Sequence, residues 1–300
     1  MYNKYDEELF LLNKRYQDIF YSTAIQRDIK FNKYKNYILN LQFKQIMEDV
    51  FFKLFIRIPS SQKGNNTPFY PKTKNDLRGK KIAVYSCIVG NYDKIIDPIH
   101  QEENVDYFMF TDLELPPSSK WKKIDISKFP EYKSMTAKQI NRKIKMLSYK
   151  YLSQYDYSVY VDGLIEIVTS VTPMIEDMGE MGLGVHYHNQ RDCVYDEAIM
   201  IKYAKKADMS IVKKQLNDYK ANGFPTHYGL YENTILIRNH HDKNTNKLMD
   251  AWWNEYIKYP TRDQLSLPYL IWKNNLKNNI FILGDNLNRN PRFNRGLKHN

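Results

Sequence analysis

The sequence predicts an α/β protein with a mainly parallel sheet flanked by helices and an N-terminal helical arm. Short apolar runs of the kind found in buried strands follow one another from residue 81 onward. Stretches with apolar residues at helical spacing lie between these runs, and strands that alternate with helices are typical of a parallel sheet. The length of 300 residues, of which 42% are hydrophobic, is sufficient for one large domain and an appendage.

The arm is expected over residues 1–58, where Leu9, Tyr16 and Phe51 belong to apolar runs at helical spacing. Residues 59–80 are rich in Ser, Asn, Lys, Pro and Gly, which is typical of a linker. Two interpretations of the arm remain open. It packs on the main domain or on a second copy of the chain in a homodimer, or it lies on a membrane surface as a basic amphipathic helix.

The main domain is expected over residues 81–287, followed by a basic tail at 288–300. Five apolar runs are expected to be strands, at residues 81–89, 105–110, 157–161, 182–187 and 234–238. Five stretches with helical spacing are expected to be helices, at residues 135–152, 198–205, 211–222, 247–259 and 264–273.

The net charge of +11 is concentrated at the two ends of the chain. Residues 1–80 hold 15 Lys and Arg against 8 Asp and Glu, and residues 288–300 hold 4 basic residues and no acid, whereas residues 81–287 hold 26 of each sign. A nucleic-acid enzyme carries basic charge around its binding groove, so this distribution argues against a nucleic-acid partner. It favours attraction of the ends to an anionic membrane surface or an acidic partner.

The N-terminal sequence has no apolar stretch of the kind found in signal peptides, and two cysteines cannot form a disulfide framework. We therefore expect a cytoplasmic protein, with the inner face of the membrane as one place of action. The sequence has no dinucleotide-binding, P-loop, zincin or α/β-hydrolase motif, which argues against those enzyme classes.

Polar residues follow three of the predicted strands, at the end where parallel sheets bind ligands. Gly90, Tyr92 and Asp93 follow the first strand, and this group combines close backbone approach, ring stacking and a carboxylate. Asp112 follows the second strand, where a carboxylate can accept hydrogen bonds from a base or ribose. Asp162 follows the third strand, where a carboxylate is suited to a diphosphate that carries Mg²⁺ or Mn²⁺. On its own the first group is better explained as an ordinary turn, and Asp112 is equally well explained as a cap. The three strand ends together favour a ligand site.

Two further groups are candidates for substrate binding. Arg142 and Lys145 lie three residues apart on one predicted helix and share a face, so they can neutralise a diphosphate leaving group or belong to a solvated basic surface. A loop dense in polar side chains is typical of a substrate wall, and its candidates are His188, Arg191, Asp192 and Glu197.

Five separated motifs then resemble one family. They are Y-S-C-I-V-G-N-Y-D at 85–93, Y-V-D-G at 160–163, H-N-Q-R-D-C-V-Y-D-E-A at 188–198, G-L-Y-E-N at 229–233 and R-D-Q-L-S at 262–266. The family includes plant turgor-regulation and seed-mucilage proteins and bacterial polysaccharide-locus proteins, and it is similar to glycosyltransferases of the A-type (GT-A). The resemblance covers about residues 81–285.

This resemblance implies a GT-A-like domain whose nucleotide pocket contains Gly90, Tyr92, Asp93 and Asp112. Asp162 and the basic pair Arg142 and Lys145 are expected to bind the same donor. Asp162 falls where such enzymes place a D-x-D metal motif, but residue 164 is Leu, so dependence on Mn²⁺ or Mg²⁺ stays open. An acid in one of two late regions commonly faces the sugar, and the catalytic candidates are Asp263 and Glu232. Their neighbours Gln264 and Asn233 are expected in the acceptor pocket.

The resulting hypothesis is a glycosyltransferase that moves a sugar from a nucleotide-diphosphate sugar to a growing glycan or lipid-linked glycan, such as a bacterial capsule or lipopolysaccharide. Two alternatives remain. One is a nucleotidyltransferase that makes a sugar nucleotide, for which the turn at residues 90–94 lacks the usual glycine-rich basic loop. The other is a non-catalytic scaffold that binds nucleotide or glycan. The sequence leaves retention or inversion at the sugar undecided.

Overall fold

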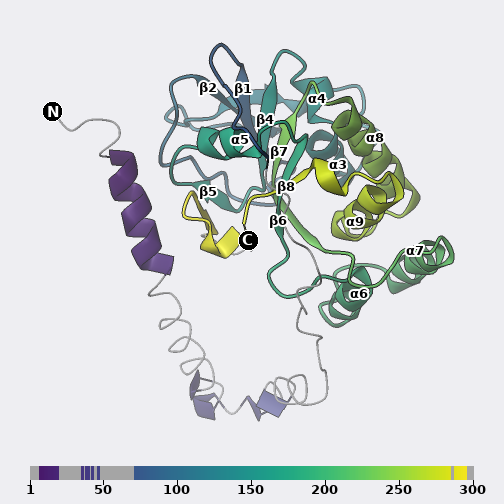
Figure 1. Cartoon of the computed structure of the whole chain (residues 1–300). Coiled ribbons are helices and arrows are strands. Elements are labelled where there is room, and N and C mark those ends of the chain that lie inside the picture. The colour runs from purple at the N-terminus through teal and green to yellow at the C-terminus, as the bar shows by residue number, and fades with distance from the viewer. Residues whose placement is uncertain are drawn as a thin grey trace. The chain divides into compact units, whose positions relative to one another are not determined.

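The computed structural model describes residues 7–19, 35–36, 38–40, 42–43, 46–47, 71–284 and 287–295 of the chain (Figure 1). The chain divides into two compact units, Met1–Ser60 and Ser61–Asn300. In the first unit residues 7–19 form a helix. Phe51 and residues 59–70 of the predicted linker lie outside the described residues. Among the described residues, no helix is long and apolar enough to cross a bilayer.

The second unit is built on a seven-stranded sheet with the order β3-β2-β1-β4-β7-β6-β8. Its strands are β1 (Ile82–Ile88), β2 (Val105–Thr111), β3 (Lys122–Asp125), β4 (Tyr157–Val161), β6 (Leu183–Tyr187), β7 (Tyr231–Asn239) and β8 (Ile280–Ile282). All neighbouring strands pair in parallel except at β7, which is antiparallel to both β4 and β6. The predicted α/β class with a mainly parallel sheet is confirmed.

Helices cover both faces of this sheet (Figure 1). They are α3 (Ala137–Met146), α4 (Ser148–Tyr151), α5 (Thr172–Met178), α6 (Val194–Tyr203), α7 (Met209–Ala221), α8 (Lys243–Lys258) and α9 (Asp263–Lys273). One face packs Tyr85 of β1 and Tyr160 of β4 against α3, α8 and α9. The other face packs Val84 and Val159 against α5. Side chains therefore alternate between two apolar layers along each strand, as the pleat requires.

The local sequence explains the elements on which the site depends. All seven residues of β1 are buried, as expected for a central strand whose sequence is a continuous apolar run. Thr136 caps the start of α3: its hydroxyl accepts a hydrogen bond from the backbone N–H of Gln139, and the Gln139 side chain accepts one from the backbone N–H of Thr136. This reciprocal capping box fixes the start of the helix that carries the basic pair.

Packed structure extends on both sides of the predicted domain limits of 81 and 287. Asn75 donates from its backbone to the carbonyl of Glu176 and from its side chain to the carbonyl of Ile175, which ties it to α5. In the segment predicted as a tail, β9 (Phe293–Arg295) pairs antiparallel with β5 (Ile165–Ile167) in a second sheet. Strands of three residues are too short for a periodic signal, so β5, β8 and β9 were not predicted.

Candidate active site

The topology places the candidate residues at one edge of the sheet. β1, β2, β4 and β6 run in the same direction, so the residues that follow them share this edge. Because β7 runs the opposite way and pairs Ile235 with Val161, residues Glu232 and Asn233 lie beyond the end of β4. The edge therefore gathers the ends of four strands and the start of a fifth, which is where α/β sheets bind ligands.

The ends of β1 and β2 are joined by Asp112. Its Oδ1 accepts a hydrogen bond of 2.9 Å from the backbone N–H of Gly90, and its Oδ2 accepts one of 2.8 Å from the hydroxyl of Tyr132. Gly90 adopts a left-handed backbone conformation with φ 63°, which favours glycine. The structure thus brings Gly90 and Asp112 together and adds Tyr132, while Tyr92 is exposed on the same turn.

The end of β4 approaches Asp93 through Gly163. A Cβ atom at Gly163 would lie 2.9 Å from Cγ1 of Ile88 and 3.3 Å from Oδ2 of Asp93, so only glycine fits without displacement. Asp93 is itself buried. The glycine after Asp162 therefore serves close packing between the ends of β1 and β4.

Asp162 is held by two neighbours on the face of the sheet that α3, α8 and α9 cover. The hydroxyl of Tyr160 donates to its Oδ1 at 2.6 Å, and burial raises the pKa of Tyr160 well above its usual range, so this hydroxyl stays a donor. The ammonium Nζ of Lys145 lies 3.6 Å from the same oxygen. The Asp162 side chain is 32% exposed, so it remains accessible to a ligand.

Asp263, in the first turn of α9, is the centre of a buried charge cluster. Its Oδ2 lies 3.0 Å from Nζ of Lys145 and its Oδ1 lies 3.5 Å from Nε of Arg142. The side chains of Asp263, Lys145 and Arg142 are 6%, 2% and 19% exposed. Burial alone would raise the pKa of Asp263, but the charges of Arg142, Lys145 and Arg262 outweigh it and hold the pKa far below its usual range.

This cluster decides between the two interpretations of the basic pair. Arg142 and Lys145 do not form a solvated surface, because Lys145 is buried, Arg142 is only 19% exposed, and both lie beside carboxylates. Lys145 lies between Asp162 and Asp263 and so links the strand-end carboxylate to the one on α9. The pKa of Arg142 is also raised above its usual value. Burial would lower it, but the negative charges of Asp263 and Asp162 outweigh that effect.

Two buried residues missed from the sequence position the cluster. The indole N–H of Trp252, which is fully buried, donates to the carbonyl of Asp263 at 3.0 Å. The Arg238 guanidinium donates to the carbonyl of Lys145 at 2.6 Å and to the hydroxyl of Tyr85 at 2.7 Å. The two Arg238 contacts join residues 93 and 153 positions apart in the sequence, so no local pattern could reveal them.

Glu232 occupies a different environment from Asp263. It pairs across the sheet with His186 and accepts a hydrogen bond of 3.4 Å from the backbone N–H of Leu287. Burial raises the pKa of Glu232, while the Leu287 bond and the charge of Arg295 oppose the shift. The two catalytic candidates thus have opposite pKa shifts, and Lys145 and Arg142 compensate only Asp263.

The neighbours of the two acids are also buried. Asn233 is 5% exposed, and neither its amide nitrogen nor its amide oxygen has a hydrogen-bond partner among the described residues. Gln264 donates to the carbonyl of Tyr231 at 2.9 Å, which ties α9 to β7. An unpaired buried amide costs about 1–3 kcal/mol, so Asn233 is a group that a ligand would satisfy.

The polar loop after β6 is organised around Glu197 and His188. Nε of Arg191 donates to Oε2 of Glu197 at 2.6 Å. Nδ1 of His188 accepts from the backbone N–H of Arg191 at 3.1 Å. Burial and the nearby charges of Arg191, Lys206 and Arg262 lower the pKa of His188 to about 4, so it is neutral at pH 7. Asp192 instead accepts a hydrogen bond from His227.

The donors around Asp162 do not fit a protein-held Mg²⁺ or Mn²⁺ ion. Such ions take several oxygen ligands, whereas Oδ1 of Asp162 already faces a hydroxyl donor and an ammonium group. Glu166, the next acid along the chain, accepts a hydrogen bond from Asn294 in the small sheet. Within the described part of the chain, Asp162 belongs to no group of three metal-ligating side chains.

The family described as TOD1/MUCI70, glycosyltransferase-like domain, matches residues 39–291. Among solved structures, the apo bifunctional glycosyltransferase WbbM is similar at a TM-score of 0.43 and 12% identity, over 70% of this chain and 40% of that one. Mouse xyloside xylosyltransferase 1 is similar at a TM-score of 0.40 and 9% identity, over 67% of this chain and 84% of that one. The glycosyltransferase GlyE of Streptococcus pneumoniae TIGR4 is similar at a TM-score of 0.38 and 12% identity, over 68% of this chain and 45% of that one. No curated protein matches. The chain spans less than half the length of WbbM and GlyE. The match over most of the sequence shows that the chain belongs to the TOD1/MUCI70 family of glycosyltransferase-like domains.

Proposed function

We propose that the chain is a GT-A-type glycosyltransferase that moves a sugar from a nucleotide-diphosphate sugar to a growing glycan or lipid-linked glycan. A bacterial capsule or lipopolysaccharide is the acceptor class we favour. The observation that carries the proposal is the Asp162–Lys145–Asp263 array at the ligand-binding edge of the sheet. Buried, mutually compensated charges at such an edge are typical of a site that is preorganised for a charged substrate.

In this proposal the turn with Gly90 and the Asp112 carboxylate holds the nucleoside, and Tyr92 stacks on the base. The sugar and diphosphate lie across the end of β4, where Asp162 is accessible. Arg142 stabilises the negative charge that develops on the departing diphosphate. Asp263 accepts hydrogen bonds from sugar hydroxyls, because a carboxylate with so low a pKa is a weak base.

The acceptor side is assigned to the polar loop after β6 and the start of β7. His188 and Arg191 line it together with Asn233, whose amide would pair with acceptor hydroxyls. Asp192 and Glu197 orient the basic and histidine side chains of this region, since each accepts a short hydrogen bond from one of them.

The direct test is binding and turnover with a panel of sugar nucleotides. A nucleotide sugar at 100 times its dissociation constant should stabilise the protein by about 2.7 kcal/mol, which thermal unfolding detects. Release of the nucleoside diphosphate then separates an enzyme from a scaffold that only binds. Binding without any release, with candidate acceptors present, would favour the scaffold.

Asp162→Ala is expected to lower turnover by about 10²-fold or more while leaving the fold intact, because the carboxylate is partly exposed and acts on the substrate. Steady-state kinetics and thermal unfolding measure the two effects. Asp106→Asn is the control, since Asp106 is a partly exposed acid that pairs with Lys122. Near-normal turnover in Asp162→Ala would make Asp162 a structural residue.

Added Mn²⁺ or Mg²⁺ is expected to change turnover little, because Lys145 and Arg142 already supply positive charge beside Asp162 and Asp263. The measurement compares initial rates in metal-depleted buffer with and without each ion. A rate that depends on either ion, and that loses this dependence in Asp162→Ala, would restore a metal role for Asp162.

The basic N-terminal arm is proposed to locate the enzyme, through peripheral membrane contact or a homodimer. Deleting residues 1–70 should leave donor binding intact, because every candidate residue lies later and Asn75 keeps its contacts with α5. Binding of the truncated chain to anionic liposomes should be weaker, because each basic residue near the membrane contributes about 1 kcal/mol to the free energy of binding. High salt should remove this electrostatic contribution. If the full-length chain forms a dimer that persists at high salt and the truncated chain does not, the arm acts in dimerisation. A folded truncated protein that binds no sugar nucleotide would place the arm in the active site.

A further inference from the structure

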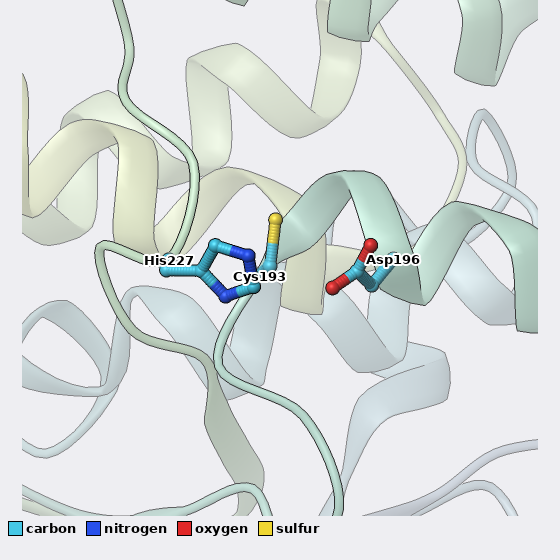
Figure 2. Close-up of side chains that lie close together, drawn as sticks. All are labelled: Cys193, Asp196 and His227. Carbon is cyan, nitrogen blue, oxygen red and sulfur yellow. The ribbon is translucent and has the colours of Figure 1, made fainter. Parts of the chain in front are cut away.

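Three potential metal ligands meet where the polar loop enters α6 (Figure 2). Cys193 is the N-cap residue of α6, Asp196 lies in its first turn, and His227 comes from the connection between α7 and β7. The thiol, a carboxylate oxygen and a ring nitrogen all lie within 4.8 Å of one another. Among the described residues, this is the one group of three or more side chains of metal-binding type.

A fourth residue orients the histidine. Nδ1 of His227 lies 2.7 Å from Oδ1 of Asp192, so this nitrogen carries the proton and donates it to the carboxylate. Nε2 is then the nitrogen left to bind a cation. Gly229 also donates from its backbone to the carbonyl of Asp192 at 2.8 Å, which ties the His227 loop to the segment before α6. Metal-binding histidines are commonly oriented by a carboxylate in this way.

The donor set selects the kind of cation. A thiolate with an imidazole and a carboxylate is typical of zinc, whereas Mg²⁺ and Ca²⁺ take oxygen ligands. Donors that share a tetrahedral zinc at about 2.0–2.3 Å lie roughly 3.5 Å apart, so atoms that lie within 4.8 Å of one another need only a short approach to bind one ion. The His227 side chain is 47% exposed and Asp196 is partly exposed, so both can rotate toward the buried sulfur of Cys193.

We propose that Cys193, Asp196 and His227 bind one zinc-type divalent cation, with Asp192 as the residue that orients His227. Three protein ligands leave the fourth position for water. The bound cation links the start of α6 to the loop before β7. It thereby fixes the segment that carries His188 and Arg191, and this role goes beyond the proposed sugar transfer.

The test uses the untagged full-length chain, stripped of metal, kept reduced and titrated with Co²⁺. Cobalt bound through a thiolate gives a charge-transfer band in the near ultraviolet and the strong visible bands of tetrahedral coordination, and Zn²⁺ should displace it. Cys193→Ala should abolish the thiolate band. Cys87→Ala is the matched control, because Cys87 is the other buried cysteine and lies in β1.

Two further variants test the histidine and its partner. His227→Asn removes the imidazole at a position with φ 54°, a conformation that Asn tolerates, and should abolish tetrahedral cobalt binding. Asp192→Asn should weaken metal affinity about 10–100-fold and keep the band, because it only orients the ligand. Circular dichroism and thermal unfolding of each metal-free variant check the fold.

The proposal is overturned if the wild-type chain shows no thiolate band, or if Cys193→Ala keeps the band that Cys87→Ala shows. An unchanged affinity in His227→Asn would overturn it as well. Sugar-nucleotide binding is measured on the same metal-free samples. Failure of the metal site with intact donor binding leaves the proposed function standing, and the reverse result leaves the metal site standing.

Discussion

Asp263→Asn is expected to reduce turnover by about 10²-fold or more and to destabilise the protein at the same time. The substitution removes the charge that compensates the buried Lys145, at 3.0 Å, and the largely buried Arg142, at 3.5 Å. Breaking a buried charge pair by removing one partner costs about 3–5 kcal/mol. Steady-state kinetics below the melting temperature of the variant separate the catalytic effect from the loss of stability.

Two control variants make this result specific. Asp250→Asn removes a half-exposed carboxylate whose ion pair with Lys150 is a surface contact, and it should cost less than about 1 kcal/mol. Glu232→Gln removes the competing catalytic candidate and is expected to alter mainly substrate affinity. If Glu232→Gln instead shows the larger loss of turnover, the two residues exchange roles and the reaction has a general base at Glu232.

The pH dependence of kcat/KM distinguishes the same two assignments. The pKa of Asp263 lies far below its usual value of 3.8, so this group stays ionised and gives no decline of activity as the pH falls toward 4. The pKa of Glu232 is raised above 4.5, so a base at Glu232 would lose activity as the pH falls through that higher value. A decline that disappears in Glu232→Gln would contradict the role given to Asp263.

The lowered pKa of Asp263 also determines how the stability of the protein depends on pH. A carboxyl group with a depressed folded pKa contributes stability that is present above its unfolded pKa and is lost as the pH falls toward the folded value. The contribution of Asp263 should therefore be complete at neutral pH and decrease only below about pH 4. Asp263→Asn should consequently lie closest to the wild type in stability in acid.

Much of this arrangement could be predicted from the sequence, because strand ends and helix faces are local signals. The apolar runs placed Asp112 and Asp162 at the carboxyl edge, and a spacing of three placed Arg142 and Lys145 on one helix face. The sequence did not indicate that this face is buried. Burial depends on α9, which brings Asp263 to a helix 121 residues earlier, counting from Arg142.

The parts that the sequence missed are contacts between distant residues. Tyr132 bonds Asp112 across 20 residues and Arg238 bonds Lys145 across 93 residues, and neither pair has a periodic or motif signal. The distinction between Asp263 and Glu232 was also hidden, because both are single acids in short motifs. Their opposite pKa shifts arise from charge compensation in one case and burial in the other, and only the fold determines these environments.

Lys145→Met is expected to destabilise the protein as strongly as Asp263→Asn does, since Lys145 is 2% exposed and lies between two carboxylates. Methionine fills a similar volume without the charge, so Asp162 and Asp263 would lose the ammonium group that lies between them, while Arg142 would stay beside Asp263. The expected loss is about 3–5 kcal/mol in the free energy of unfolding, measured by denaturant titration at neutral pH. Lys150→Met is the matched control, because Lys150 lies in the adjacent helix α4, pairs with Asp250 at the surface and should cost at most about 1 kcal/mol.

The double variant Lys145→Met/Asp263→Asn tests whether the cost comes from the charge pair itself. If Lys145 mainly compensates Asp263, the second substitution removes the uncompensated carboxylate, and the double variant should be more stable than the sum of the two losses predicts, by about 0.5–3 kcal/mol. Additive losses would mean that the two side chains act independently in spite of their 3.0 Å separation. A single Lys145→Met variant as stable as the wild type would show that the buried ammonium is not needed to hold Asp162 and Asp263 together, and Lys145 would then lose its place at the centre of the proposed site.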